Sequence, residues 1–266
     1  MELKINGLEY NNLFSNLNFN VSSNSVTSII GKNSIGKSLL LSVIAGNLLG
    51  DEELRIDDLK INKNSTKEAI NTYRKNISYL SSNSYKELFN INILEDLKYG
   101  QDSTNFEILE DLLYTFNLKN DILRKNYMEI STSEKQKVAL VYTFLKNSKI
   151  ILLDNPTMYL DNKCIQNLIK LIRKEKRKDK IIIITSNNSD FILQASDDVA
   201  ILDNKKILIK ENKYNVLGNE KLMNKIDFEI PNIIKFQKKV LELKGVKLSN
   251  RDNINDLIKD IYRSVK

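Results

Sequence analysis

The chain has 266 residues, enough for one α/β domain with a small appendage, and its 41% hydrophobic content argues against a disordered protein. The net charge is +7, but lysines alternate with acidic residues, and the densest basic run, residues 173–180, is interpreted as a solvated helix end; no aromatic interleaving favours nucleic acid. The single cysteine, Cys164, excludes an internal disulfide and a cysteine-based zinc site and fits a reducing cytosol. The sequence contains no histidine, so the commonest general base is absent.

The first elements predicted are strands. Residues 1–5 and 13–21 alternate apolar and polar side chains around Asn-rich turns, which is typical of an antiparallel β-meander. Tyr10 is expected in the turn between two of these strands. Its ring could stack on an adenine or pack as an edge residue of the sheet, and the pattern alone leaves both open.

A phosphate-binding loop is predicted next. The segment 26–30, with the apolar residues Val26, Ile29 and Ile30, reads as a strand; GKNSIGKS follows, and Leu39 opens an apolar run typical of a helix. The loop fits GxxxxGK[ST] at every fixed position, so backbone N–H groups and the helix start should converge on an anion. Lys37 should reach the β- and γ-phosphates, and the Ser38 hydroxyl should bind Mg²⁺. The predicted nucleotide-binding residues of this Walker A loop are Gly31, Lys32, Asn33, Ser34, Ile35, Gly36, Lys37, Ser38 and Leu39.

The rest of the chain alternates helices and strands around a helical insertion. A short strand pair is predicted at residues 55–61 and a strand at 77–80, and residues 85–146 show helical spacing of apolar residues. Strands at 149–153, 181–185, 199–202 and 206–209 then alternate with helices at 163–173 and near Phe191, followed by a polar, mostly helical tail. This order predicts an α/β fold with a largely parallel sheet.

One carboxylate is placed to hold a metal ion. Residues 150–154 read IILLD, a buried strand that ends in Asp154. An Asp at the carboxyl end of a central strand lies where an open α/β sheet binds ligands, and it can hold Mg²⁺ through water. Asp154 is therefore interpreted as the Walker B acid rather than as the cap of a turn before Pro156.

The order of these motifs resembles a known family. GKNSIGKS, NINILEDLKYG, ISTSEKQKVAL, IILLDNPTMYLD and IIIITSNNSDF together look like the nucleotide-binding subunit of an ATP-binding-cassette (ABC) transporter over about the first 210 residues. The tail, with LMNKIDFEIPNIIKFQKKVLELKGVKL and INDLIKDI, is similar to the ATPase subunits of energy-coupling-factor (ECF) importers of micronutrients. The resemblance implies a cassette at residues 1–215, with a helical subdomain at about 85–147, and a C-terminal extension at 216–266 that serves as a dimerisation element.

The resemblance also implies ligands, partners and roles. The ligands would be ATP and Mg²⁺, with Tyr10 stacking on the adenine and Asp161 as the D-loop acid that faces a second cassette. Each ATP would lie between one chain's phosphate loop and the other's signature motif, here Ser131, Thr132, Ser133 and Glu134. A second ATPase subunit, in a heterodimer, and an integral membrane subunit would be partners, and no nucleic acid is expected. No apolar window is long enough for a membrane span and no signal peptide is visible, so a soluble protein at the cytoplasmic face of the membrane is expected.

Several positions depart from the family pattern. The signature lacks both glycines of LSGGQ, and Glu134 places a carboxylate where the partner's phosphate would approach. Asn155 stands in place of the catalytic glutamate, and an amide cannot accept a proton from water. Ser186 and Ser82 stand in place of the switch histidine and the Mg²⁺-sensing glutamine, and Ser34 in place of a third loop glycine.

These departures predict a chain that binds MgATP but hydrolyses it weakly or not at all. Loss of a general base typically costs 10²- to 10⁴-fold in rate. One hypothesis is a transporter subunit whose partner supplies the catalytic groups. The alternative is a non-catalytic nucleotide sensor or scaffold with the same fold.

Overall fold

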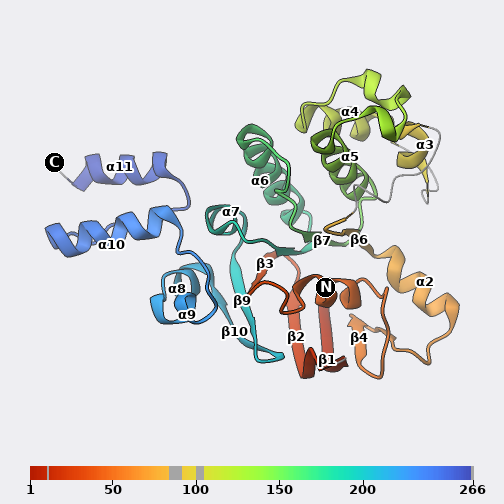
Figure 1. The fold of residues 1–266 in the computed structure, drawn as a ribbon, viewed down its shortest axis with the longest axis horizontal. Helices are drawn as coiled ribbons and strands as arrows, with labels where there is room; N and C mark the ends of the chain where they lie inside the picture. The colour runs from red at the N-terminus through yellow and green to blue at the C-terminus, as the bar shows by residue number, and fades with distance from the viewer. Residues whose placement is uncertain (11, 84–91, 100–104, 265–266) are drawn as a thin grey trace.

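The computed structural model describes residues 1–10, 12–83, 92–99 and 105–264, which form two β-sheets with helices packed around them (Figure 1). The larger sheet has six strands in the order β10-β9-β3-β8-β7-β6. Neighbouring strands are parallel except for β9 and β10. Their bounds are β3 Ser25–Ile30, β6 Ile77–Leu80, β7 Ile150–Asp154, β8 Ile181–Thr185, β9 Asp198–Asp203 and β10 Lys206–Asn212.

The smaller sheet contains the N-terminal strands. Its order is β2-β1-β4-β5, all antiparallel, with bounds β1 Glu2–Tyr10, β2 Phe14–Ser22, β4 Glu53–Ile56 and β5 Leu59–Ile61. The predicted turn position of Tyr10 is wrong, because Tyr10 is the last residue of β1 and pairs with Phe14. Two register shifts within β1 absorb the irregular residues, so the pairing with β2 continues to the end of the strand.

Both faces of the six-stranded sheet are buried along β7 and β8, which explains the continuous apolar runs of these two strands. Along β7, Ile150 and Leu152 pack in a cluster with α1 (Lys37–Ile44) and the smaller sheet. The alternate residues, Ile151 and Leu153, pack against helices on the opposite face. The predicted α/β cassette fold with an antiparallel β-subdomain is confirmed.

The helices on that opposite face include α5 (Thr132–Leu145), α6 (Asn162–Lys176) and α7 (Ser189–Ala195). Further helical segments are α2 Lys67–Lys75, α3 Ile93–Lys98, α4 Phe106–Thr115 and the 3-10 turns η2 Asn120–Arg124 and η3 Tyr127–Glu129. The predicted helical stretch also included residues 84–91 and 100–104, which lie outside the described residues. Helix α2 is not predicted from the sequence pattern, because Tyr73 is its one buried side chain and gives no apolar stripe.

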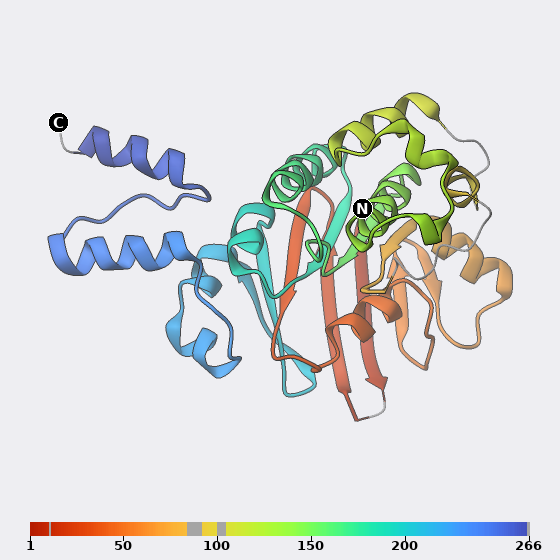
Figure 2. The same ribbon diagram turned by 45° about the horizontal axis from the view of Figure 1, so that its top comes forward.

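The C-terminal region divides into a part packed on the cassette and a part that projects from it. Val216, Leu217 and Met223, on α8 (Lys213–Leu217) and α9 (Glu220–Lys225), belong to the main core. Helices α10 (Asn232–Lys244) and α11 (Ile254–Ser264) lie side by side away from both sheets (Figures 1 and 2). The predicted division after residue 215 falls within α8 and stays a prediction. Across the described residues, each helix is too short or too polar to cross a bilayer.

Candidate nucleotide-binding site

The loop between β3 and α1 has a shape that requires glycine at two positions. Gly31 has a φ of 155°, and an added Cβ would lie 2.4 Å from the carbonyl oxygen of Leu202. Gly36 is the N-cap of α1 with a φ of 104°, and its Cβ would lie 3.1 Å from Cζ of Phe14. The backbone can therefore make this turn only with glycine at both sites.

Lys37 is enclosed by the loop it follows. The side chain is 8% exposed, and Nζ donates hydrogen bonds to the carbonyl oxygens of Gly31 at 2.7 Å and Lys32 at 2.9 Å. Burial lowers the pKa of Lys37, while the charge of Asp154 opposes that shift. A buried ammonium at the start of a helix is a strong attractor for phosphate.

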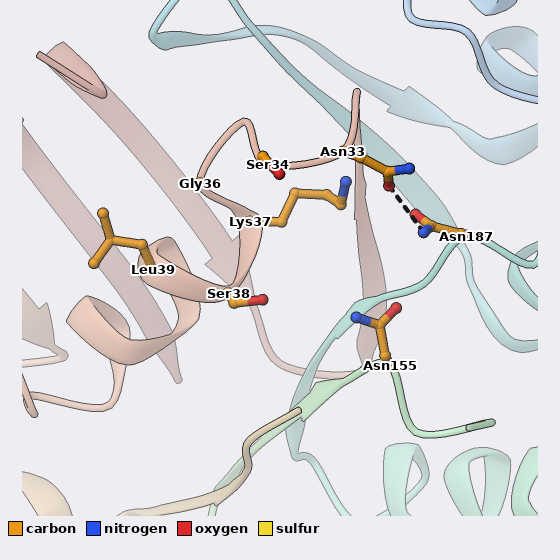
Figure 3. Close-up of a pocket in the computed structure, with 8 residues that line it drawn as sticks. All are labelled: Asn33, Ser34, Gly36, Lys37, Ser38, Leu39, Asn155 and Asn187. Atoms are coloured by element: carbon orange, nitrogen blue, oxygen red, sulfur yellow. Dashed lines mark hydrogen bonds between the residues drawn. The ribbon is translucent and has the colours of Figure 1, made fainter. Parts of the chain in front are cut away.

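A cavity of about 220 Å³ opens in front of this loop (Figure 3). Most of its lining comes from the predicted phosphate loop and the first turn of α1, and two asparagines from other loops complete it. The lining residues are Asn33, Ser34, Gly36, Lys37, Ser38, Leu39, Asn155 and Asn187. Ser34 reaches the cavity with a φ of 60°, so a serine here adopts the left-handed conformation that glycine usually takes. Gly31, Lys32 and Ile35 shape the loop without lining this cavity.

Asp154 has the environment of a metal-binding carboxylate. It lies at the end of β7, 1% exposed, and its Oδ1 accepts hydrogen bonds from Thr185 Oγ1 and, at 3.3 Å, from Asn155 Nδ2. Its Oδ2 is buried and has no hydrogen-bond partner among the described residues. Such an orphaned carboxylate oxygen is costly, and a hydrated Mg²⁺ would satisfy it. Ser38 and Asp154 therefore fit a magnesium site completed by water and phosphate oxygens.

The loop after β8 differs from what the motif comparison suggests. Ser186, expected at the switch position, is 1% exposed, and its Oγ accepts the backbone N–H of Asn188 at 3.1 Å. It does not line the cavity. The next residue, Asn187, does, and its Nδ2 donates to Oδ1 of Asn33 at 3.1 Å (Figure 3). Asn187 is not among the predicted site residues, although its position just after β8 places it at the same sheet edge as Asp154.

The remaining predicted residues lie outside this cavity. Ser82 is half-buried in the turn after β6. Tyr10 is half-buried against the core cluster of the smaller sheet, and its contact with adenine stays a prediction. Asp161 is the N-cap of α6, where it accepts the N–H of Cys164 at 2.8 Å. That hydrogen bond is the main reason why the pKa of Asp161 is lowered.

The segment predicted as the signature begins α5. Ser131 is the N-cap, and Glu134 folds back on it: Glu134 Oε2 accepts the Ser131 N–H at 2.8 Å and the Ser131 hydroxyl at 2.7 Å. Ser131 Oγ accepts the Glu134 N–H at 3.3 Å, which completes a capping box. The hydrogen bond from the Ser131 backbone is the first cause of a lowered pKa of Glu134. The Glu134 carboxylate thus caps the N-terminus of α5. Thr132 and Ser133 lie between Ser131 and Glu134 in the first turn of this helix.

Comparison with known proteins identifies the family of this chain. The chain matches the family described as "ABC transporter" at residues 14–158. It is 24% identical to the energy-coupling factor transporter ATP-binding protein EcfA3 of Oenococcus oeni, over 84% of this chain and 80% of that protein. It is 26% identical to EcfA1 of Fusobacterium nucleatum, over 96% of this chain and 95% of that protein.

Solved structures show the same fold. The structure of cbiO1 from Clostridium perfringens, described as part of the ABC transporter complex cbiONQ, superposes with a TM-score of 0.68 at 21% identity, covering 89% of this chain and 98% of that one. A dimeric ATP-binding cassette, MJ0796, bound to ADP and phosphate, gives a TM-score of 0.68 at 19% identity, covering 79% and 98%. The family match spans more than half of the sequence, and the chain therefore belongs to the ABC transporter family, as an ATP-binding subunit that takes ATP with Mg²⁺.

Proposed function

We propose that this chain is the ATP-holding subunit of an ECF-type importer of a micronutrient, with its own hydrolysis weak or lost. The observation that carries the proposal is the composition of the phosphate cavity. Among the described residues that line it, Lys37 alone is ionisable, and Asn155 occupies the position beside Asp154. An amide can orient a water molecule but cannot take its proton. The cavity therefore suits binding of MgATP better than its cleavage.

The importer subclass and the partners are supported by the relatives and by the tail. Relatives named as ECF transporter ATP-binding proteins cover most of this chain. We infer a second, catalytically intact cassette as the partner in a heterodimer, and an integral membrane subunit that holds both at the cytoplasmic face.

The C-terminal extension, residues 216–266, would contribute to the contact with the second cassette. Its helices α10 and α11 expose apolar side chains that isolated surface helices rarely carry together. These are Phe236, Leu241, Leu243, Ile254, Ile258 and Tyr262. Replacing Leu243 and Ile254 by lysine should reduce co-purification with the partner subunits while leaving the cassette folded, since both side chains are exposed. Unchanged co-purification would contradict this role.

The test of the proposal is to restore the base. The Asn155→Glu variant should hydrolyse ATP roughly 10²-fold faster than the wild type, measured for the chain alone and with its partner subunits. Asn155→Gln is the matched control, because it lengthens the side chain without adding a base. Wild-type turnover at the ordinary rate of a cassette ATPase, and no faster in Asn155→Glu, would contradict the proposal.

A nucleotide-bound regulatory scaffold is the second candidate, favoured by the start of α5. The Ser131 hydroxyl donates to Glu134, so this hydroxyl is not free to donate to a nucleotide held by a second cassette. A scaffold would bind ATP, and no partner would restore turnover. Failure of every partner cassette to support hydrolysis, with ATP binding intact, would favour it over the transporter.

A further inference from the structure

We propose that Asn187, together with Asn33, forms an amide clamp that holds the terminal phosphoryl group of the bound nucleotide. The clamp would make the cavity selective for a nucleoside triphosphate over the diphosphate. The inference rests on the proposed function, in which this cavity holds ATP without cutting it.

The two asparagines meet across the cavity from distant parts of the chain. Asn33 belongs to the phosphate loop, and Asn187 follows β8, 154 positions later. Because β8 lies between β3 and β7 and runs parallel to both, its loop leaves the sheet at the edge where the phosphate loop and Asp154 lie. Figure 3 shows Asn187 and Asn155 on the wall opposite Ser38 and Leu39.

The residues on either side of Asn187 in the chain make hydrogen bonds within their own turn. Ser186 is buried and accepts the N–H of Asn188. Asn188 in turn caps α7, since its Oδ1 accepts the N–H of Phe191 at 2.9 Å. Asn187 is exposed and faces the cavity, so it is the residue of this turn that can contact a ligand.

The chemistry of the pair suits a phosphoryl group. Each amide carries two N–H donors, and their mutual hydrogen bond uses one N–H of Asn187 and the oxygen of Asn33. Among the described residues no other group hydrogen-bonds to either side chain, so the remaining N–H donors can turn toward phosphoryl oxygens. Amides do not titrate, and they bring no negative charge that would repel the phosphate.

Their place in the cavity assigns them to the end of the phosphate chain. The first turn of α1 and Lys37 would hold the phosphates nearer the loop, as any phosphate loop does. The wall that carries Asn155 and Asn187 closes the side of the cavity away from the loop. A diphosphate held by the loop would leave the space beside this wall empty, and a third phosphoryl group would fill it. Lys37 would attract the phosphates by its charge, and the two amides would orient the terminal phosphoryl group by directional hydrogen bonds.

The test compares two nucleotides in the full-length chain. Calorimetry would measure Kd for MgADP and for the magnesium complex of a β,γ-imido analogue of ATP, which is not hydrolysed. Asn187→Ala should weaken binding of the triphosphate about 10-fold, the effect of one hydrogen bond to a charged group, and change that of ADP less than about 2-fold. Asn187→Asp, nearly isosteric but negative, should weaken the triphosphate more, about 100-fold.

Two further variants complete the design. Asn33→Ala should show the same selectivity as Asn187→Ala, because it removes the other arm of the clamp. Asn64→Asp is the matched control: it adds the same charge at an exposed amide that does not line the cavity, and should change neither constant. Thermal unfolding would verify that every variant is folded, as expected for exposed side chains.

The outcomes separate the clamp from the proposed function. If the wild type binds both nucleotides and the Asn187 variants change neither constant, or weaken both equally, the clamp is wrong and the proposed function stands. If the wild type binds neither nucleotide, the proposed function fails and the clamp fails with it.

Discussion

Two helix N-termini in this molecule have opposite chemistry. Helix α1 begins after Gly36, with no side-chain cap and no acidic residue in its first turn. Helix α5 begins after Ser131, with a capping box and Glu134 in its first turn. Both ends carry backbone N–H groups that lack intrahelical partners, and both have the positive end of a helix dipole.

The difference shows how a helix start becomes a binding site. At α1 the donors are left to an external anion, and Lys37 adds a buried positive charge behind them. At α5 an internal carboxylate takes the place that an external anion would occupy, and it also engages the Ser131 hydroxyl. The N-terminus of α1 leaves its N–H groups available for phosphate because its own sequence does not cap it.

The largest effect is expected from removing the charge of Lys37 at the uncapped N-terminus of α1. Lys37→Ala should weaken MgATP binding by about 3 kcal/mol, roughly 100-fold in Kd, because it removes a charged donor to the phosphates. Calorimetry would measure it, with Lys170→Ala, an exposed lysine on α6, as the control for lost charge. Equal affinity for MgATP in Lys37→Ala and wild type would contradict the conclusion that the N-terminus of α1 and Lys37 bind the phosphates.

The loop that leads into α1 should be nearly as sensitive. Gly31→Ala forces a Cβ against the Leu202 carbonyl oxygen, and we expect a loss of about 2 to 3 kcal/mol in unfolding free energy, with weakened ATP binding. Gly245→Ala is the control, because Gly245 also has a positive φ but no described atom lies within 4 Å of its Cβ. That variant should lose only about 1 kcal/mol. Urea denaturation of both would show whether the clash or the backbone angle dominates.

The capped N-terminus of α5 should become less stable when its capping carboxylate is removed. Glu134→Ala should lower the unfolding free energy by about 1 kcal/mol, because the Ser131 N–H loses its acceptor. Glu134→Gln keeps an acceptor at that position and should lose less. Glu110→Ala, on the exposed side of α4, is the matched control for removing a helical glutamate. A loss no larger in Glu134→Ala than in Glu110→Ala would mean that the capping box adds nothing.

The smallest effect is the pH dependence of that cap. Hydrogen bonds from Ser131 lower the pKa of Glu134 in the folded protein, so its stabilising charge is fully present above the ordinary glutamate pKa of about 4.3. The contribution is lost as pH falls through the lowered pKa. The difference in unfolding free energy between wild type and Glu134→Gln should therefore shrink between pH 7 and pH 3. A difference that stays constant over this range would exclude a charge effect.

Local patterns predicted most of the elements around the site. The strands β6 and β8 have the bounds predicted for them, residues 77–80 and 181–185, and the phosphate loop lies between a strand and a helix as its spacing requires. Prediction failed where the outcome depended on contacts between distant segments. Tyr10 extends β1 because β2 continues to pair with it, and Ser186 turns inward because Asn188 donates to its hydroxyl.

The sequence by itself determined the α/β fold, the glycines of the phosphate loop and the carboxylate at the end of β7, because each follows from local periodicity or from a backbone angle that few residues adopt. Only the tertiary structure decided which side chains share the cavity. The parallel order β3-β8-β7 brings Asn187, Asn155 and Asn33 to one edge of the sheet, and local sequence spacing does not tell which residues of each loop face the cavity there.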